Sequence, residues 1–418
     1  MGNHTAADYT SRVVDRIPQA VEAPPPNAYP LFLAGMGSRF GAWGLQNVMF
    51  QWLVVEQLSA SAERVGTAQM AILLPNLMFL LLGGAIADRI DRVRALVRLH
   101  LAASFSCAGL AALVFYGWLS YPLLIGYALL MGTLQSFVIP ARDAQLSDVA
   151  DSGMSRAVAG LTMVQHGGQG IGALGAGLAN LVGAPLVLGL QSLILLAGTL
   201  ATRRLPRVER PPRESRAPLR LVELRAGLVE VMGSQVLRAV MLLNVSVGLV
   251  FVGSYLVILP LLVREFYGGG AARMGILAAV LPIGSIIINL GILVRGGIER
   301  KGLSLLLGQG FAGLCLGGLA FGLPFWGAAL STVGWGVGAA FAINASRTLF
   351  QEHASEANRG RVLSVYSLAI LGTAPAGALL TGFLAGRVGT LETLAIHSSA
   401  MTALILATLL FTQVRRFR

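Results

Sequence analysis

Polar side chains inside long apolar runs are the residues of this 418-residue chain whose types could do chemistry. Arg39 lies about ten residues into the apolar run 29–57, near the middle of a membrane at ~1.5 Å per helical residue. Charge at that depth is costly, so it usually binds a ligand or pairs with a carboxylate. Trp43, Asn47 and Gln51 continue the same helical stripe at a spacing of four. The stripe predicts a face that lines a solute cavity rather than one that contacts lipid.

Isolated amides occur in the second half of the chain at Asn244, Asn289 and Asn344. Asn244 and Asn344 are expected to lie opposite the Arg39 stripe. An interhelical hydrogen bond is the equally simple interpretation of each amide.

Titratable groups inside the apolar runs are few. His166 could change its charge near neutral pH, and Asp143 follows Arg142 at the end of the run 121–141. These two are the candidate proton carriers, although a neutral, hydrogen-bonded histidine is the more ordinary interpretation of His166. No acidic residue falls at mid-depth in any apolar run, and Glu56, near the outer end of the first run, is expected to be solvated.

Enzymatic chemistry finds little support in the sequence. Cys107 and Cys315 fall in different apolar runs and indicate small apolar fillers rather than a disulfide or a metal site. No nucleophile–base set, metal cluster or nucleotide-binding motif stands out. We therefore predict no catalytic residues and no cofactor.

Composition explains why these polar groups matter. The chain is 55% hydrophobic and 12% charged, whereas soluble domains carry about 25% charged residues. Apolar runs of about 20 residues are the length of a membrane-spanning helix. The sequence therefore predicts an all-α membrane protein with twelve spans, at 29–57, 65–87, 93–118, 121–141, 157–181, 183–202, 237–263, 272–295, 302–321, 323–346, 361–386 and 389–412.

A proline- and arginine-rich stretch divides the spans six and six. We expect a disordered tail over 1–28, a six-helix bundle over 29–202, a cytoplasmic linker over 203–236, a second six-helix bundle over 237–413 and a short basic tail over 414–418. The two halves contain similar sequence stretches, as in transporters built from internal repeats. The linker arginines could touch anionic lipid, or the linker could be a solvated spacer that helps to fix topology.

The net charge of +12 reflects orientation rather than nucleic-acid binding. Of the 31 basic residues, 26 fall on the side of the termini and 4 on the other side. Positive residues concentrate on the cytoplasmic side of membrane proteins. Both termini are thus predicted in the cytoplasm.

The turn 83–94, between the second and third spans, concentrates four charges within five residues. Asp88 could accept hydrogen bonds from the amino end of the span 361–386 and favour its helix dipole. Arg89 and Arg92 could form charge-assisted bonds with nearby carboxylates, and Gly84 permits a tight approach. The turn predicts a cytoplasmic gate; the alternative is that its arginines only mark the inner side.

This turn resembles the loop signature of the major facilitator superfamily. Gly84, Ala87, Asp88, Arg89 and Arg92 match it, whereas Ile86 and Asp91 depart from it. The resemblance implies two bundles around a central cavity that opens alternately to each side.

Three further stretches are similar to bacterial exporters related to the enterobactin exporter, and they lie at 140–142, 359–364 and 372–377. They add Arg142, Arg359 and Arg361 to the expected gate. A partial antiporter signature adds Gly168, Gly172, Gly175 and Gly177, with Ala173 where that signature has proline. The resemblance implies proton-coupled export of a small amphipathic, drug-like or siderophore-like solute, by a monomer in the lipid bilayer of the bacterial inner membrane.

Two alternatives remain open at this point. One is an importer or facilitator of a small metabolite. The other, of a different class, is a non-transporting membrane sensor or assembly partner, although a static scaffold needs no switchable loop.

Overall fold

The computed structural model describes residues 25, 27–87, 91–150, 153–206, 221–295 and 297–417, with side chains described at all of these except 80–87, 155 and 221–223. Most of the expected amino-terminal tail, together with Asp88 and Arg89, lies outside these ranges. Within them the chain is helical and contains no strand. Helices suit a bilayer because each satisfies its own backbone hydrogen bonds.

The first bundle comprises the helices before residue 204. They are α2 (Ala28–Trp52), which continues as the π-helical turn η1 (Leu53–Gln57), α3 (Ala62–Ala87), α4 (Arg92–Phe115), α5 (Tyr121–Val149), α6 (Met154–Gly175) with η2 (Ala176–Leu178) and α7 (Ala179–Val182), and α8 (Ala184–Arg203). Asp91 caps α4 by accepting a hydrogen bond from the backbone N–H of Arg94 at 3.0 Å.

The second bundle repeats this plan. Its helices are α10 (Gln235–Ser246), continued by the π turns η3 (Val247–Val252) and η4 (Ser254–Ile258) and by α11 (Leu259–Phe266); α12 (Ala271–Arg295); α13 (Lys301–Leu319); α14 (Phe325–His353); α15 (Arg359–Leu371) with α16 (Ala374–Val388); and α17 (Thr390–Phe411), followed by η5 (Val414–Arg416). A further helix, α9 (Leu221–Gly233), lies inside the stretch expected to be linker.

Nine of the helical segments in the described part are long and apolar enough to cross a membrane. The other expected spans correspond to α2 with η1, to α3, and to α6 with η2 and α7. Segments α2 and α6 are less apolar because both carry glutamines and α2 also carries Arg39. The two-bundle, all-α membrane fold predicted from the sequence is confirmed.

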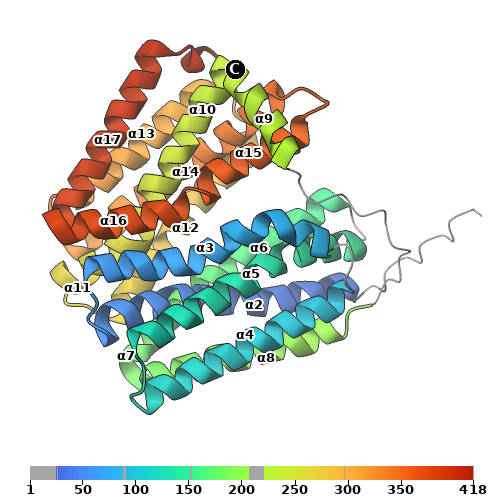
Figure 1. Cartoon of the computed structure of the whole chain (residues 1–418), viewed down its shortest axis with the longest axis vertical. Coiled ribbons are helices and arrows are strands. Elements are labelled where there is room, and N and C mark those ends of the chain that lie inside the picture. Colours follow the sequence, from blue (N-terminus) through green and yellow to red (C-terminus); the bar gives the residue numbers. More distant parts are fainter. Residues whose placement is uncertain are drawn as a thin grey trace, which may run out of the picture.

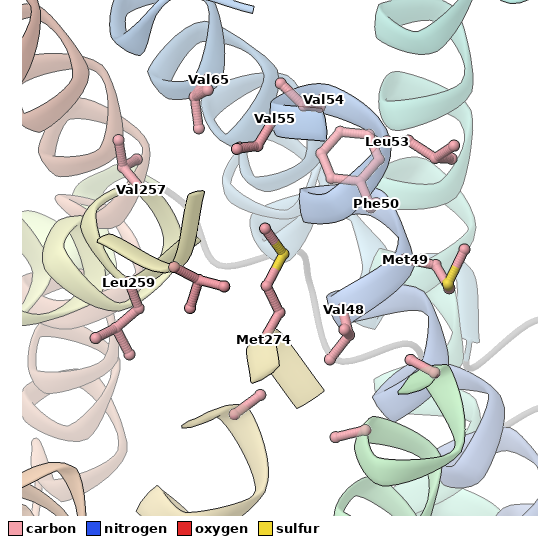
Figure 2. Packing of buried hydrophobic residues seen from close by; sticks show 14 of the residues in the cluster. Val48, Met49, Phe50, Leu53, Val54, Val55, Val65, Val257, Leu259 and Met274 are labelled. Carbon is pink, nitrogen blue, oxygen red and sulfur yellow. The ribbon is translucent and has the colours of Figure 1, made fainter. Parts of the chain in front are cut away.

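The bundles join at one end and separate at the other (Figure 1). At the joined end α3 packs on α16, and α6 packs on α12. One hydrophobic cluster crosses the junction and includes Val54 and Val55 from the first bundle and Val257 and Met274 from the second (Figure 2). At the end where α9 lies, each bundle has its own separate cluster. The molecule is therefore closed at the end away from α9 and open at the α9 end.

Candidate solute-binding site

A cavity of about 380 Å³ lies between the bundles, walled mainly by α2, α3, α5 and α6. Among the described residues, the second bundle contributes Leu256 and Leu371 to its lining. The sequence stripe explains the α2 wall, because positions 39, 43, 46, 47 and 50 recur at helical spacing and face one side.

Arg39 is the charged centre of this wall. Its side chain is buried, and Nη2 donates a hydrogen bond to Gln135 Oε1 at 2.7 Å. Nε and Nη1 are buried and make no hydrogen bond with the described residues. A buried cation with unused donors is costly. The arrangement therefore suits an anionic group that enters the cavity and accepts from those donors.

Neutral amides surround Arg39, and none of the described residues that line the cavity carries a carboxylate. The amides are Gln46, Asn47, Gln69, Asn76, Gln135, Gln165 and Gln169. Gln69 Nε2 and Asn76 Oδ1 are buried without a hydrogen-bond partner among the described residues. Amides both donate and accept, so this lining can bind several oxygen atoms of one solute while it favours negative charge.

A second cation stands at the rim. Arg142 lines the cavity, and its guanidinium carbon lies 5.9 Å from the centre of the Phe40 ring. It also pairs with the exposed carboxylate of Asp143 at 2.8 Å. His166 is half-buried on α6 and does not line the cavity. That either Asp143 or His166 carries a proton stays a prediction.

Buried hydrogen bonds hold the α2 wall in place from behind. Gln46 Oε1 accepts from the hydroxyl of Tyr127 on α5 and from Gln191 Nε2 on α8, the latter at 2.8 Å. Gln191 Nε2 also donates to the carbonyl of Ala42 at 3.2 Å. These contacts fix the rotation of α2, and hence the direction in which Arg39 points.

The residues of the expected site are distributed unevenly. Arg39, Trp43 and Asn47 line the cavity, whereas Gln51 lines a separate small hollow beside Tyr255. Asn244 is buried within the second bundle and does not line the cavity. Asn344 donates to Asn289 Oδ1 at 2.8 Å and lines a different groove.

The sequence pattern did not single out five of the lining amides, namely Gln69, Asn76, Gln135, Gln165 and Gln169. Each lies within an expected span or at its end, as Arg39 does. That position was the signal that could have found them.

Two of the expected gate residues make side-chain contacts within their own bundles. Arg92 pairs with Asp148 at 2.6 Å, and Arg361 Nη1 donates to Asn358 Oδ1 at 2.7 Å. Gly84 lies in the last turns of α3, and Arg359 is exposed at the start of α15. Since the bundles are apart at this end, the gate they would form stays a prediction.

Polar contacts between the bundles occur instead at the closed end. Arg264 Nη1 donates to the carbonyl of Ala60 at 2.8 Å. Glu56 Oε1 accepts from the N–H of Gly270 at 3.3 Å, and Asn180 Oδ1 accepts from the N–H of Ala271 at 3.0 Å. Glu56 was expected to be solvated, and its side chain is half-buried here, where the amino end of α12 supplies free N–H groups that its carboxylate can cap.

The four glycines of the expected antiporter signature permit close helix packing at three of their positions. A Cβ on Gly168 would lie 3.2 Å from the Gly41 nitrogen, and one on Gly172 would lie 2.8 Å from the Leu45 nitrogen, both on α2. A Cβ on Gly177 would lie 3.1 Å from Ala272 Cα in the other bundle, whereas the space at Gly175 is open. Small residues at these positions let helices approach closely.

Comparison with known proteins matches this chain to membrane transporters. The model of the transmembrane secretion effector family matches residues 29–417. A staphyloferrin A transporter of Staphylococcus aureus (strain NCTC 8325 / PS 47) is 26% identical over 378 residues, which cover 87% of this chain and 90% of that protein.

Solved structures share the fold at low identity. The nucleoside transporter NupG superposes with a TM-score of 0.72 at 14% identity, covering 92% of this chain and 98% of that chain. An auto-inhibited peptide transporter of the POT family gives 0.71 at 15% identity, covering 94% and 98%. With the family match over nearly its whole length, the chain belongs to the transmembrane secretion effector family, and it is a multi-pass secondary transporter of the major facilitator type.

Proposed function

We propose that this transporter exports a small, anionic, oxygen-rich solute of the siderophore type across the bacterial inner membrane, by alternating access coupled to protons. The observation that carries the proposal is Arg39, buried in the cavity with two nitrogen atoms unpaired among the described residues. The ring of neutral amides supports it, as does the name of the staphyloferrin A transporter.

The direction of transport rests on two supports. The family is described as a secretion effector, and the excess of basic residues predicts that the open, α9 end faces the cytoplasm. In that orientation a solute made in the cell would enter the cavity directly. Apolar side chains among the amides, including Trp43, Ile72 and Phe50, suit the carbon skeleton of an amphipathic solute.

Binding to purified protein tests the solute-binding part. Staphyloferrin A should raise the thermal unfolding temperature of the wild type, and Arg39→Gln should weaken its binding about 30-fold, because a buried charge-assisted hydrogen bond is lost. Arg39→Lys should recover only part of the affinity, since an ammonium lacks the guanidinium fork. Arg98→Gln is the matched control, because Arg98 is exposed on α4 and does not line the cavity. Equal affinity of Arg39→Gln and wild type would overturn the proposal.

The same solute in proteoliposomes tests direction and coupling. An imposed pH gradient should drive solute toward the acidic lumen of vesicles that hold the protein with its α9 end outward. An unchanged rate after the gradient is collapsed would reject proton coupling. Movement only in the opposite direction would indicate import.

A further inference from the structure

A second and larger space lies outside the central cavity. It is a groove of about 1060 Å³ between α12 and α13, with α14 as its floor. Every residue that lines it belongs to the second bundle, and none of them lines the central cavity. The groove is therefore separate from the central cavity and could hold a different ligand.

The lining of this groove has two chemically different parts. Isoleucines and a phenylalanine form an apolar wall, at Ile287, Ile288, Ile292, Ile298 and Phe341. The turn between α12 and α13 supplies three cations, Arg295, Arg300 and Lys301, against a single lining carboxylate, Glu299. An occupant that fits both parts carries an apolar chain and a negative head.

The positive charges at this turn are only partly compensated. Lys301 Nζ pairs with Glu352 at 2.9 Å. Within the described part of the chain, no ion pair is recorded for Arg295 or Arg300, and both are exposed. On the α14 floor, Asn344 donates a hydrogen bond to Asn289 of α12, so its amide nitrogen already has a partner inside the protein.

The position of the groove in the membrane favours a lipid as its occupant. Helices α12 and α13 are both apolar enough to span a bilayer, so the turn that joins them lies at a membrane surface and the apolar wall lies below it. Beside the groove, Leu290, Leu293 and Val294 are 57%, 76% and 85% exposed, as residues that face lipid are. Basic pockets between membrane helices bind anionic lipid head groups.

We propose that this groove is a binding site for one anionic phospholipid. The phosphate accepts from Arg295 and Arg300, and an acyl chain lies along Ile288 and Ile292. The site also has a mechanical consequence: α12 packs on α6 at its other end, where the bundles close. A lipid that braces α12 against α13 therefore stabilises the helix on which that closure depends.

Lipid retention on the purified protein tests the proposal. Native mass spectrometry after titration with dioleoyl-phosphatidylglycerol should show one tightly retained lipid on the wild type. The double variant Arg295→Gln/Arg300→Gln should retain it about 30-fold more weakly. Arg203→Gln/Arg204→Gln removes the same charge at the same end of the molecule, from exposed positions on the first bundle, and should behave as the wild type does.

Two further probes separate the sources of a bound phosphate. Inorganic phosphate and dioleoyl-phosphatidylcholine should each leave the thermal unfolding temperature unchanged, whereas phosphatidylglycerol should raise it. Ile288→Trp, which fills the apolar wall, should weaken lipid retention while both arginines remain. Equal retention by the two double variants would overturn the proposal, as would stabilisation by inorganic phosphate to the same extent.

Discussion

Arg39 can act on a solute only if its helix is held in one rotation. Gln191 does this from α8, because it is fully buried and bridges Ala42 and Gln46 on α2. Tyr127 reaches the same Gln46 oxygen from α5. The cavity residues thus rest on buried partners that do not themselves line the cavity.

The substitution Gln191→Leu tests this support. Losing two buried hydrogen bonds in a membrane bundle should cost about 1 kcal/mol of stability and should lower the thermal unfolding midpoint in detergent. The affinity for staphyloferrin A should also fall, because Gln46 loses one of its two partners. Thr133→Val is a suitable control, since that exposed hydroxyl bonds only within its own helix. Normal affinity at reduced stability would show that Gln191 does not position the site.

At the scale of elements, α9 fastens the chain between the bundles to the second bundle. Glu230 on α9 accepts from the N–H of Ser355 at 2.7 Å, from the Ser355 hydroxyl at 3.0 Å and from Asn358 Nδ2 at 2.8 Å. Asn358 in turn accepts from Arg361, one of the expected gate residues. The helix therefore links the stretch between the bundles to the start of α15.

These donors make the attachment dependent on pH. The backbone N–H of Ser355, followed by the side chains of Asn358 and Ser355, holds the pKa of Glu230 below its ordinary value of 4.5. A lowered carboxyl pKa contributes stability that is fully present above the ordinary value and is lost as the pH falls through the lowered one. Hydrogen-exchange protection of the Ser355 amide should therefore drop as the pH falls below 4.5, relative to its value at pH 7. Glu230→Gln should remove that pH dependence; an unchanged acid response in this variant would contradict the assignment.

The sequence predicted these elements well where apolar length decides them. Each expected span overlaps a helical segment of the structure. The helix α9 was not expected because its stretch is rich in arginine and proline and lies between membrane segments. Its order depends on Gly227, where a Cβ would lie 2.7 Å from the Arg361 carbonyl, and on buried Val231. Such contacts across more than a hundred residues are not encoded in local pattern.

For the whole molecule, the state of the transporter depends on which end of the bundle interface is closed. Arg264 and Glu56 join residues more than two hundred positions apart. Sequence pattern could place Arg39 on a polar stripe that lines the cavity, because the stripe follows from spacing. It could not place Glu56, because its partner is a helix end brought near only by the packing of two bundles.

The substitution Arg264→Ala should shift the molecule toward the state that is open at the other end. Loss of the hydrogen bonds to Ala60 and Val55 should raise the population of that state by roughly 5-fold. Electron–electron distance measurements can follow it, with spin labels at exposed positions 147 and 347 of the two bundles, after replacement of Cys107 and Cys315. In the variant, the share of molecules with a shorter distance between the two spin labels should increase. Arg64→Ala is the control, since Arg64 lies over Tyr121 within its own bundle. The same distribution in both variants would rule out a closing role for Arg264.

The π-helical turns give the first helix of each bundle a property that a regular helix lacks. They occupy Leu53–Gln57 in the first bundle, and Val247–Val252 and Ser254–Ile258 in the second. A π turn holds about one more residue than an α turn, so the helix beyond it is offset in angular register. Converting such a turn to α geometry would rotate the remaining segment about its axis. The two bundles could then exchange the side chains that face each other by a screw motion at the junction, while the outer helices that meet the bilayer stay still.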